Sequence, residues 1–339
     1  MLPALAVAEA LRGRGARVTF AGSPARAEAR LVPEAGFELD TFRVSGLPRR
    51  PGLAQAHAVL HSLAAPAACE RILARRRPDV VLGGGGYVSG PMMLAAARRR
   101  IPAALMEADA HLGLANRLAV PFARRVFLSF PIPGREPPKY RVTGRPIPDR
   151  SNPLPQDEAR RRFELPDEGT VLLVAGGSLG ARALNDLAIE SFGAAGPAVL
   201  HLSGENEYER LRGRVVRPDY RLLPFTDAYG AALGAADLVL SRAGGGVWEL
   251  AAAGKPAILV PYPLATADHQ TKNARYFQTA GGAILVPEGE LGRVPEIVRS
   301  LFGDLRRLEE MSSAMLRVAR PEAAQEIAEE LIGLASARG

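Results

Sequence analysis

Several stretches of this sequence place glycines and polar side chains directly after an apolar run, where a β-strand would end. In "VLLVAGGSLGARALND", Gly176, Gly177 and Ser178 stand between a predicted strand and a predicted helix. Glycines let the backbone approach a ligand closely, and the free amides at a helix start favour an anion. The stretch matches neither a G-x-G-x-x-G nor a P-loop pattern, which argues against a dehydrogenase or a P-loop NTPase. We expect phosphate to bind here; the alternative is a tight turn that needs glycine only for its geometry.

A second glycine run lies in "VLGGGGYVSGPMM", where Gly83–Gly86 follow a predicted strand and Ser89 stands at a predicted helix start. The same backbone chemistry makes this turn a candidate ligand loop. Tyr87 either faces a ligand or packs against the protein. From this stretch alone the two interpretations are equally supported.

The third glycine turn lies in "LSRAGGGVWELAAAGKPAILVP", where Gly244, Gly245 and Gly246 precede a predicted helix that carries Glu249 in its first turn. An isolated glutamate at that position ordinarily interacts with the helix dipole. A carboxylate can also accept both hydroxyl hydrogens of a cis-diol such as a ribose. Trp248 beside it is more typical of a core residue than of a ligand platform.

One strand later, "DHQTKNA" gathers polar side chains before another predicted helix. Gln270 and Asn273 in this group can both donate to and accept from sugar hydroxyls. Two neighbouring strands of a parallel sheet end at the same edge, so these amides are expected near Glu249. Together they favour a nucleotide-sugar site over the dipole interpretation.

A pair of carboxylates follows a strand in "AALMEADAHLGLANRLA", where Glu107 and Asp109 stand close to His111. Such a group could perform general acid–base catalysis. The alternative is that Asp109 caps the following helix. The five histidines are scattered and the acidic residues lack ligand spacing, so no metal site is predicted.

Strand-like runs alternate with helix-like segments along the whole chain, which predicts an α/β fold with parallel sheets. The pattern pauses in the proline-rich "GRPIPDRSNPLP" and restarts at "TVLLVAGG", so we expect two similar doubly wound domains around a cleft. The tail "PEAAQEIAEELIGLASARG" is typical of one amphipathic helix. Ligands of such sheets collect at the carboxyl ends of the strands.

The chain has 339 residues, with 43 Lys and Arg against 36 Asp and Glu. The basic excess lies entirely in residues 1–150 and includes the arginine triplets at 75–77 and 98–100. Few aromatics and no nucleic-acid-binding motif accompany this charge, so we expect no nucleic acid partner. The apolar segment "LAQAHAVLHSLAAPAACERILARRR" favours an anionic membrane surface instead. Cys69 is the only cysteine, which excludes an internal disulfide and fits a reducing compartment.

Six motifs resemble, in order and spacing, those of one known family. They are "GGYVSGP", "GLANRLA" with "FARRVFLSF", "VTGRPI", "VAGGSLGARALN", "SRAG" with "ELAAAGKPAILVP", and "DHQTKNA". The chain resembles the MurG family of bacterial glycosyltransferases over about residues 3–290. The resemblance implies two Rossmann-like domains in the GT-B arrangement, with an inverting reaction and no metal or cofactor.

The activity that this resemblance implies is transfer of N-acetylglucosamine from UDP-N-acetylglucosamine to undecaprenyl-diphosphate-linked muramoyl-pentapeptide. This reaction converts lipid I to lipid II in peptidoglycan synthesis, at the cytoplasmic face of the cell membrane. The implied domains are an acceptor- and membrane-facing domain at 1–146, a UDP-sugar domain at 147–320, and a terminal helix at 321–339 that could pack back on the first domain. A GT-B transferase with another lipid or natural-product acceptor, or a non-catalytic nucleotide-sugar-binding relative, is the alternative.

Carried over position by position, the resemblance places the donor mainly in the second domain. Ser178 matches the serine beside the donor phosphates, and Thr226 in "PFTDAYG" matches a position whose backbone reads the uracil. Glu249 matches the glutamate that binds the ribose diol, while Gln270 and Asn273 match the polar pair that faces the nucleotide sugar. The glycines at 244–246 would approach the diphosphate, and Glu107 and Asp109 are the catalytic candidates that remain.

Three motifs depart from the family pattern. "RAGGGVWEL" is one residue shorter than the family's "RAGASTIAEL" turn and lacks Ser and Thr, so backbone amides would have to contact phosphate. The family's "HEQN" reads "MEAD" here, without the histidine. "GNPVR" reads "GRPIP", so Pro148 replaces an arginine, and Arg145 or Arg150 is the candidate substitute.

The opening "MLPALAVAEALRGRGARVTF" predicts a helix from about its third residue and then a strand. In the family a strand and a "GGTGGH" loop stand directly before this helix. The resemblance therefore implies that the central strand of the first sheet, an acceptor-binding glycine loop and a histidine base belong ahead of Met1. On this basis we expect the 339-residue form to be unstable or inactive.

Overall fold

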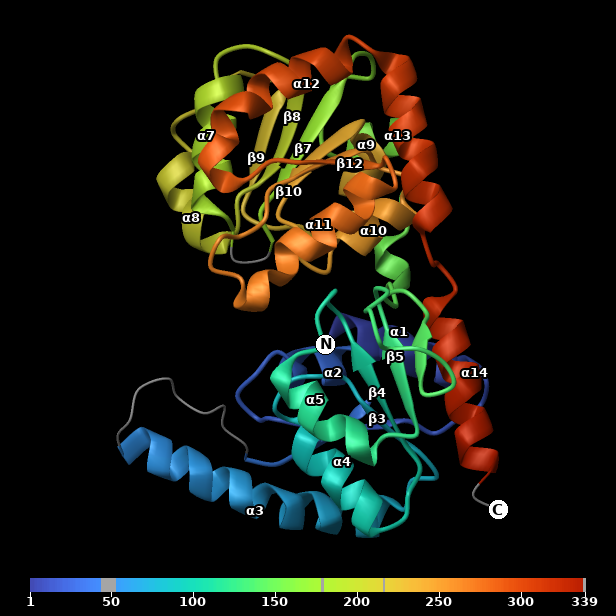
Figure 1. Ribbon diagram of the computed structural model, residues 1–339. Helices are drawn as coiled ribbons and strands as arrows, with labels where there is room; N and C mark the ends of the chain where they lie inside the picture. The colour runs from blue at the N-terminus through green and yellow to red at the C-terminus, as the bar shows by residue number, and fades with distance from the viewer. Residues whose placement is uncertain (44–52, 178–179, 216, 338–339) are drawn as a thin grey trace. The chain divides into compact units, whose positions relative to one another are not determined.

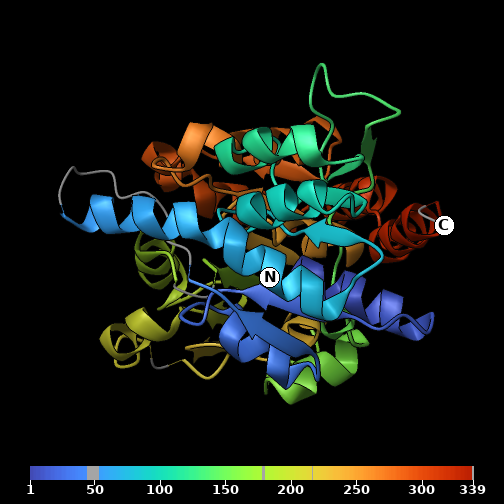
Figure 2. The same ribbon diagram turned by 90° about the horizontal axis from the view of Figure 1, so that it is seen from below.

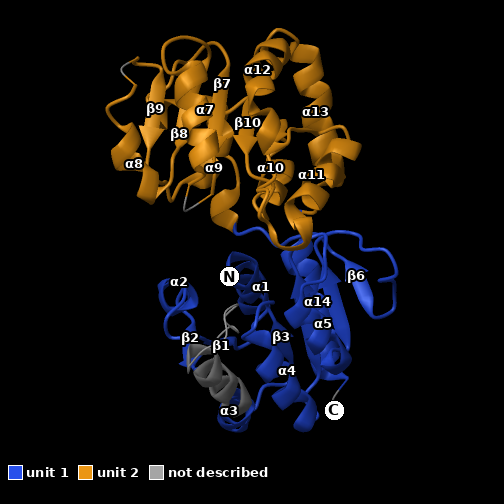
Figure 3. Ribbon diagram, turned by 60° about the vertical axis from the view of Figure 1, so that its left-hand side comes forward, with its two compact units in different colours: residues 1–148, 321–339 blue, residues 149–320 orange. Residues whose placement is uncertain are grey.

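A computed structural model describes residues 1–43, 53–177, 180–215 and 217–337, with the side chains of 53–64 not described. The chain forms two compact units (Figure 3): one contains Met1–Pro148 together with Pro321–Gly339, and the other contains Asp149–Arg320. We call them unit 1 and unit 2. Each is built on parallel strands, and the predicted α/β class is confirmed.

Unit 1 alternates helices and strands along the chain (Figure 1). Its elements are α1 (Leu2–Gly13), β1 (Thr19–Gly22), α2 (Glu28–Glu34), β2 (Glu38–Thr41), α3 (Leu53–Arg76), β3 (Val81–Gly83), α4 (Ser89–Arg98), β4 (Ala103–Glu107), α5 (Leu114–Ala119), the 3-10 helix η1 (Val120–Phe122), β5 (Arg125–Leu128), β6 (Tyr140–Val142) and, from the end of the chain, α14 (Ala323–Ser336). The predicted opening helix is confirmed, with Pro3 in its first turn.

The strands of unit 1 form two separate parallel sheets among the residues that the structure describes. One has the order β1-β2 and the other has the order β3-β4-β5-β6. Helix α1 joins them, because Leu5 and Ala8 pack in the cluster of the first sheet while Ala6 and Val7 pack in the cluster of the second. The amphipathic tail forms α14, which packs against α1 and the second sheet.

Helix α3 runs alongside α4 on unit 1 (Figure 2). Its last turn is fixed to β2 by Asp40, which accepts hydrogen bonds from Arg75 Nη2 at 2.6 Å and from Arg76 Nε at 2.7 Å. The apolar half that suggested a membrane surface, residues 53–64, lies outside the described side chains. Across the described residues, the helices are too short or too polar to cross a bilayer.

Unit 2 is one six-stranded parallel sheet with the order β12-β11-β10-β7-β8-β9. Its elements are η2 (Asp149–Ser151), α6 (Gln156–Arg162), β7 (Val171–Ala175), α7 (Arg182–Phe192), β8 (Ala198–Leu202), α8 (Glu205–Leu211), β9 (Tyr220–Leu223), α9 (Tyr229–Ala235), β10 (Leu238–Ser241), α10 (Val247–Ala252), β11 (Ala257–Leu259), η3 (Thr266–Asp268), α11 (His269–Thr279), β12 (Ala283–Leu285), η4 (Glu288–Arg293), α12 (Val294–Phe302) and α13 (Leu305–Val318). The buried strands β7 and β8 read as near-continuous apolar runs, as expected for a parallel sheet covered on both faces.

The strand order of unit 2 reverses between β7 and β10, which are neighbours in the sheet. In doubly wound sheets the crevice for ligands opens at such a reversal, at the carboxyl ends of the strands. The glycine turns that follow β7 and β10 therefore leave the sheet side by side at this edge. Their place in the topology, rather than their glycine content alone, makes them candidate ligand loops.

Candidate functional site

The turn after β7 is shaped so tightly that only glycine fits at two of its positions. A Cβ on Gly176 would lie 2.5 Å from the backbone nitrogen of Ala181, and one on Gly180 would lie 2.1 Å from the carbonyl oxygen of Ser203. The chain then enters α7, whose described first turn has no side-chain cap. Uncapped amides at a helix N-terminus are suited to an anion. Ser178, the predicted phosphate contact, lies outside the described residues.

The turn after β10 places Gly244, Gly245 and Gly246 ahead of α10, also without a side-chain cap among the described residues. Glu249 lies half-buried in the first turn of α10, and its amide donates to the carbonyl oxygen of Gly246 at 3.0 Å. Its charge is close enough to Tyr229 to raise the pKa of that hydroxyl, after the larger effect of burial. Trp248 is buried, as its sequence context predicted.

The predicted polar pair on α11 divides between two tasks. Asn273 is fully buried and its Nδ2 donates to the carbonyl oxygen of Ala243 at 3.1 Å, directly before the glycine turn. Gln270 accepts a hydrogen bond through Oε1 from the backbone amide of Tyr262 at 2.9 Å, in the loop after β11. The two amides therefore connect α11 to two different loops at the same edge of the sheet.

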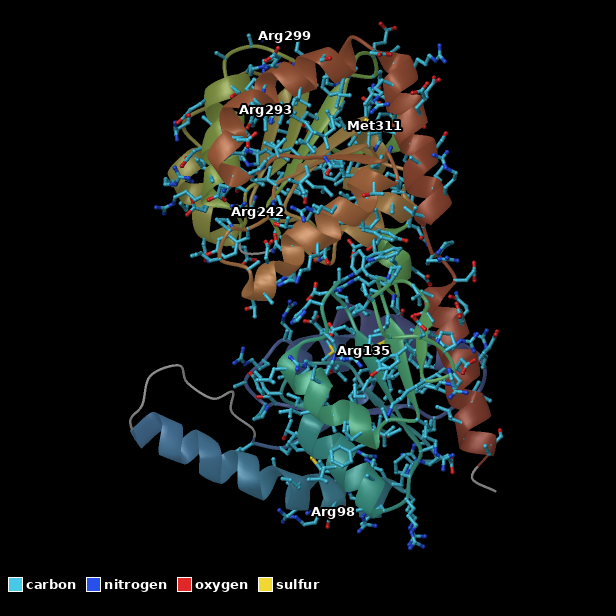
Figure 4. All side chains as sticks on the ribbon, viewed as in Figure 1. Arg98, Arg135, Arg242, Arg293, Arg299 and Met311 are labelled. Carbon is cyan, nitrogen blue, oxygen red and sulfur yellow. The ribbon has the colours of Figure 1, made fainter. Side chains whose placement is uncertain are left out.

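Arg242 is a site residue that sequence reasoning missed. Its guanidinium donates to the carbonyl oxygens of Val260 and Pro261 at 3.3 and 3.2 Å, pairs with Glu288, and lies 5.5 Å from the centre of the Tyr262 ring. Labelled in Figure 4, it joins the loops that follow β10, β11 and β12. The only sequence signal was an arginine at a strand end, immediately before a glycine turn.

The loop after β9 ends in an exposed ring and a small hydrogen-bonded turn. Thr226 accepts a hydrogen bond through Oγ1 from the backbone amide of Ala228 at 3.1 Å, which fixes the local backbone. Phe225 beside it is 48% exposed. An exposed aromatic ring next to a fixed backbone is suited to a flat, hydrogen-bonding ligand such as a base.

In unit 1 the carboxyl ends of the strands surround a cavity of about 60 Å³. Its lining includes Met1, Gly84, Glu107, Ser129 and Arg145. Burial and the charge of Arg145 lower the pKa of the Met1 amine. The cavity therefore brings the second glycine run together with the predicted Glu107 and Arg145.

Glu107 is buried and its carboxylate is occupied by its own loop. Oε1 accepts from the amides of Ala108 and Asp109 at 2.9 and 3.3 Å, while Oε2 accepts from the amide of Gly113 at 3.0 Å and from Asn116 Nδ2 at 2.8 Å. The next helix, α5, begins only at Leu114 with Gly113 at its N-cap, so the alternative that Asp109 caps that helix is wrong.

Tyr87 lies half-buried in the turn before α4, and the Arg26 guanidinium stands 5.5 Å from the centre of its ring. Ser89, the first residue of α4, donates through Oγ to the carbonyl oxygen of Gly85 at 2.8 Å. The predicted helix start is thus confirmed. Among the described residues, no group of three His, Cys, Asp or Glu side chains is arranged to hold a metal ion.

Two units built on Rossmann-like parallel sheets, with glycine turns at the carboxyl ends of the strands, have the GT-B fold of nucleotide-sugar glycosyltransferases. The sequence profiles of the glycosyltransferase family 28 N-terminal and C-terminal domains match residues 1–128 and 171–330. Together with the relatives described next, these matches show that the chain belongs to the MurG family of glycosyltransferases.

The curated relatives include enzymes named UDP-N-acetylglucosamine--N-acetylmuramyl-(pentapeptide) pyrophosphoryl-undecaprenol N-acetylglucosamine transferase. That of Halorhodospira halophila is 42% identical, over 96% of this chain and 92% of its own. That of Verminephrobacter eiseniae is 41% identical, over 91% of this chain and 87% of its own. Among solved structures, MurG of Acinetobacter baumannii is 29% identical with a TM-score of 0.75, over 98% of this chain and 95% of that one. The calicheamicin glycosyltransferase CalG4, 18% identical with a TM-score of 0.69, shares the fold.

Proposed function

We propose that this protein transfers N-acetylglucosamine from UDP-N-acetylglucosamine to the muramoyl-pentapeptide of lipid I, which yields lipid II. The observation that carries the proposal is the carboxyl edge of the unit 2 sheet, where two uncapped helix starts, Glu249 and Gln270 come together. This set offers amides for a diphosphate, a carboxylate for a cis-diol and an amide for sugar hydroxyls. The activity named for the relatives supports it.

Each predicted residue then has a distinct part in holding the donor. Ser178 and the amides of Gly244, Gly245 and Gly246 would bind the diphosphate, and Glu249 would accept from the ribose hydroxyls. The backbone at Thr226 would meet the uracil. Gln270 would contact the transferred sugar, and Asn273, which is fully buried, would act by fixing the glycine turn through Ala243.

The reaction is a direct displacement with inversion. The muramoyl 4-hydroxyl oxygen bonds to the anomeric carbon, the bond from that carbon to the diphosphate oxygen breaks, and the hydroxyl proton passes to a base. Amides at the two helix starts would stabilise the charge that develops on UDP. In unit 1 we propose that Glu107 shapes the 107–116 loop through its four hydrogen bonds. Asp109 beside it would take the proton. Arg145 and Tyr87 would meet the acceptor.

Incubation of the purified protein with labelled UDP-N-acetylglucosamine and a lipid I analogue tests the function directly. We expect a labelled product that co-migrates with lipid II. A product formed only with a different lipid or natural-product acceptor would contradict the acceptor assignment. No transfer to any acceptor, with UDP-N-acetylglucosamine still bound, would identify a non-catalytic relative.

We further propose that unit 1 binds an anionic membrane surface from the cytoplasmic side. Leu114, Leu118 and Phe122 are 69%, 67% and 38% exposed and recur every fourth residue along α5 and η1, so they form one apolar strip. Exposed arginines lie on α5, just after η1, and at the end of the neighbouring α4; they are Arg98, Arg99, Arg100, Arg117 and Arg124. An apolar strip with a basic border is typical of interfacial binding.

Vesicle flotation tests this surface. We expect the protein to float with phosphatidylglycerol vesicles but not with phosphatidylcholine vesicles, and to be released by salt. The double variant Leu114→Ser, Leu118→Ser should lose flotation. Leu305→Ser is the matched control, since Leu305 is 62% exposed on unit 2. Equal flotation of the double variant and the control would contradict this surface.

A further inference from the structure

The interior of unit 2 contains a hydrogen-bonded network of polar side chains, and the proposed reaction does not use it. His201 on β8 has no exposed surface, and its ring contacts Tyr220 Oη through Nδ1 at 2.8 Å and Asn185 Oδ1 through Nε2 at 2.9 Å. Asn185, on α7, is equally buried. Placing three polar side chains in an apolar core is costly unless every group finds a partner.

The hydrogen bonds among Asn185, His201 and Tyr220 allow only one arrangement of protons. Asn185 Nδ2 donates to the backbone carbonyl of Ser203 at 2.9 Å, and a carbonyl can only accept. The other end of the Asn185 amide, Oδ1, therefore accepts from His201, which must carry its proton on Nε2. His201 Nδ1 is then bare and accepts from the hydroxyl of Tyr220. Burial lowers the pKa of His201 to about 3, which keeps the ring neutral.

This hydrogen-bonded network reaches the first glycine turn through Ser203. The carbonyl oxygen of Ser203, which Asn185 fixes, is the atom that a Cβ on Gly180 would approach to 2.1 Å. Ser203 is also fixed by its amide, which donates to the carbonyl oxygen of Leu223 at 3.0 Å. Gly180 closes the turn, donating its amide to the carbonyl oxygen of Gly177 at 2.9 Å. The turn before α7 therefore packs directly against the Ser203 carbonyl through Gly180.

We infer that His201, in its Nε2-protonated form, is a positioning residue that seats the glycine turn and the start of α7 by holding Asn185 against the Ser203 carbonyl. The inference rests on the proposed function, since it takes this helix start as the end that receives the donor diphosphate. His201 itself touches no substrate. Its effect reaches the ligand through Asn185, Ser203 and Gly180.

The tautomer can be measured on the unaltered protein. A ¹⁵N–¹H correlation spectrum of the imidazole nitrogens, assigned by comparison with His201→Gln, should show a protonated Nε2 and a bare Nδ1 at neutral pH. The opposite tautomer, or a doubly protonated ring, would overturn the inference. With the opposite tautomer Asn185 would have to turn, and its amide could no longer donate to Ser203.

Calorimetric titration with UDP and with uridine tests the consequence. His201→Phe removes the donor to Asn185, and we expect UDP affinity to fall by about tenfold with uridine affinity unchanged, because only the phosphate-binding turn is disturbed. His201→Gln keeps a donor at the position of Nε2 and should retain most of the UDP affinity. Leu200→Ala is the control. It removes a buried side chain from the opposite face of the same strand and should not alter the ratio of UDP affinity to uridine affinity.

The outcomes separate this inference from the proposed function. A folded His201→Phe variant that binds UDP as the unaltered protein does would overturn the inference, as would equal losses for UDP and uridine. If His201→Phe does not fold, the tautomer of the unaltered protein decides. Failure of the unaltered protein to bind UDP at all would instead overturn the proposed donor site.

Discussion

At the scale of single residues, Glu249 carries the sharpest expectation for the donor site. Its half-buried carboxylate in the first turn of α10 is proposed to accept from the ribose hydroxyls. Loss of such a charged hydrogen bond costs about 1.5–3 kcal/mol, or roughly 10- to 150-fold in affinity. We expect Glu249→Ala to raise the KM for UDP-N-acetylglucosamine by that factor. Steady-state kinetics should also show that the variant no longer distinguishes the ribose donor from its 2′-deoxy analogue.

The exposed Glu209→Ala on α8 serves as the control for charge alone. An unchanged KM in Glu249→Ala would remove this residue from the donor site. It would return Glu249 to the simpler role of a helix-dipole partner.

Arg242 gives a second expectation at this scale, since it joins three loops through a planar guanidinium. Lysine cannot contact two carbonyl oxygens, an aromatic ring and Glu288 in the same way. Because the loop after β11 is linked to Gln270, we expect Arg242→Lys to raise the KM for the nucleotide sugar by about three- to tenfold. Inhibition by UDP should change less. A parallel loss of UDP inhibition would show that Arg242 supports the whole edge rather than the sugar-binding loop.

These residues also show where sequence reasoning ends. The glycine turns and Glu249 could be assigned to strand and helix ends because their positions follow from local patterns. Asn273 turns inward to Ala243, and Arg242 reaches across two further loops. Which atom a side chain meets across the sheet edge depends on packing between segments distant in the sequence. No local pattern records that packing.

At the scale of elements, strands such as β7 follow from their continuous apolar runs, whereas β2 has no such run. Its sequence, "ELDT", has an acidic residue at a position that the fold buries. Asp40 is 8% exposed, and the arginines at the end of α3 compensate its charge. A strand with an acidic residue at a buried position lacks the apolar pattern that predicts a buried strand. Predicting β2 would have required knowing that the arginines of α3 pair with Asp40.

The ion pairs of the Asp40 carboxylate should make the stability of unit 1 depend on pH. Hydrogen bonds from Arg76, opposed by burial, lower the pKa of Asp40 in the folded protein. A lowered folded pKa means that the stabilisation is fully present above the unfolded pKa of about 3.9 and is lost as the pH falls through the folded value. Asp40→Asn should therefore lower the melting temperature of unit 1 at pH 7, with the difference from the unaltered protein shrinking below about pH 4.

Thermal unfolding of both proteins between acid and neutral pH measures this effect. Asp157→Asn provides the control, because Asp157 pairs with Arg161 on the exposed surface of α6. A difference between Asp40→Asn and the unaltered protein that persists undiminished in acid would show that the ion pair is not its cause.

At the scale of the whole molecule, the two units can be compared strand by strand. In unit 2 the order β9-β8-β7-β10-β11-β12 places β7 at the centre, followed by a glycine turn and α7. In unit 1 the two sheets, β2-β1 and β3-β4-β5-β6, follow the strand order of unit 2 on either side of its central strand. Among the described residues, however, no strand lies between β1 and β3. Helix α1 packs on both sheets. We propose that a parallel strand added between β1 and β3 would pair with both of them.

Supplying that strand should therefore stabilise unit 1. Each buried backbone group that gains a partner removes a cost of about 1–3 kcal/mol. We expect a chimera, in which a designed apolar strand and a glycine turn precede this chain, to melt several degrees higher, at about 2–4 °C per kcal/mol. Its transferase activity should rise with it. The amides of β1 and β3 should become protected from hydrogen exchange in the chimera but not with a glycine–serine extension of equal length. Equal protection and equal melting temperatures in the two extended proteins would show that these strand edges need no partner.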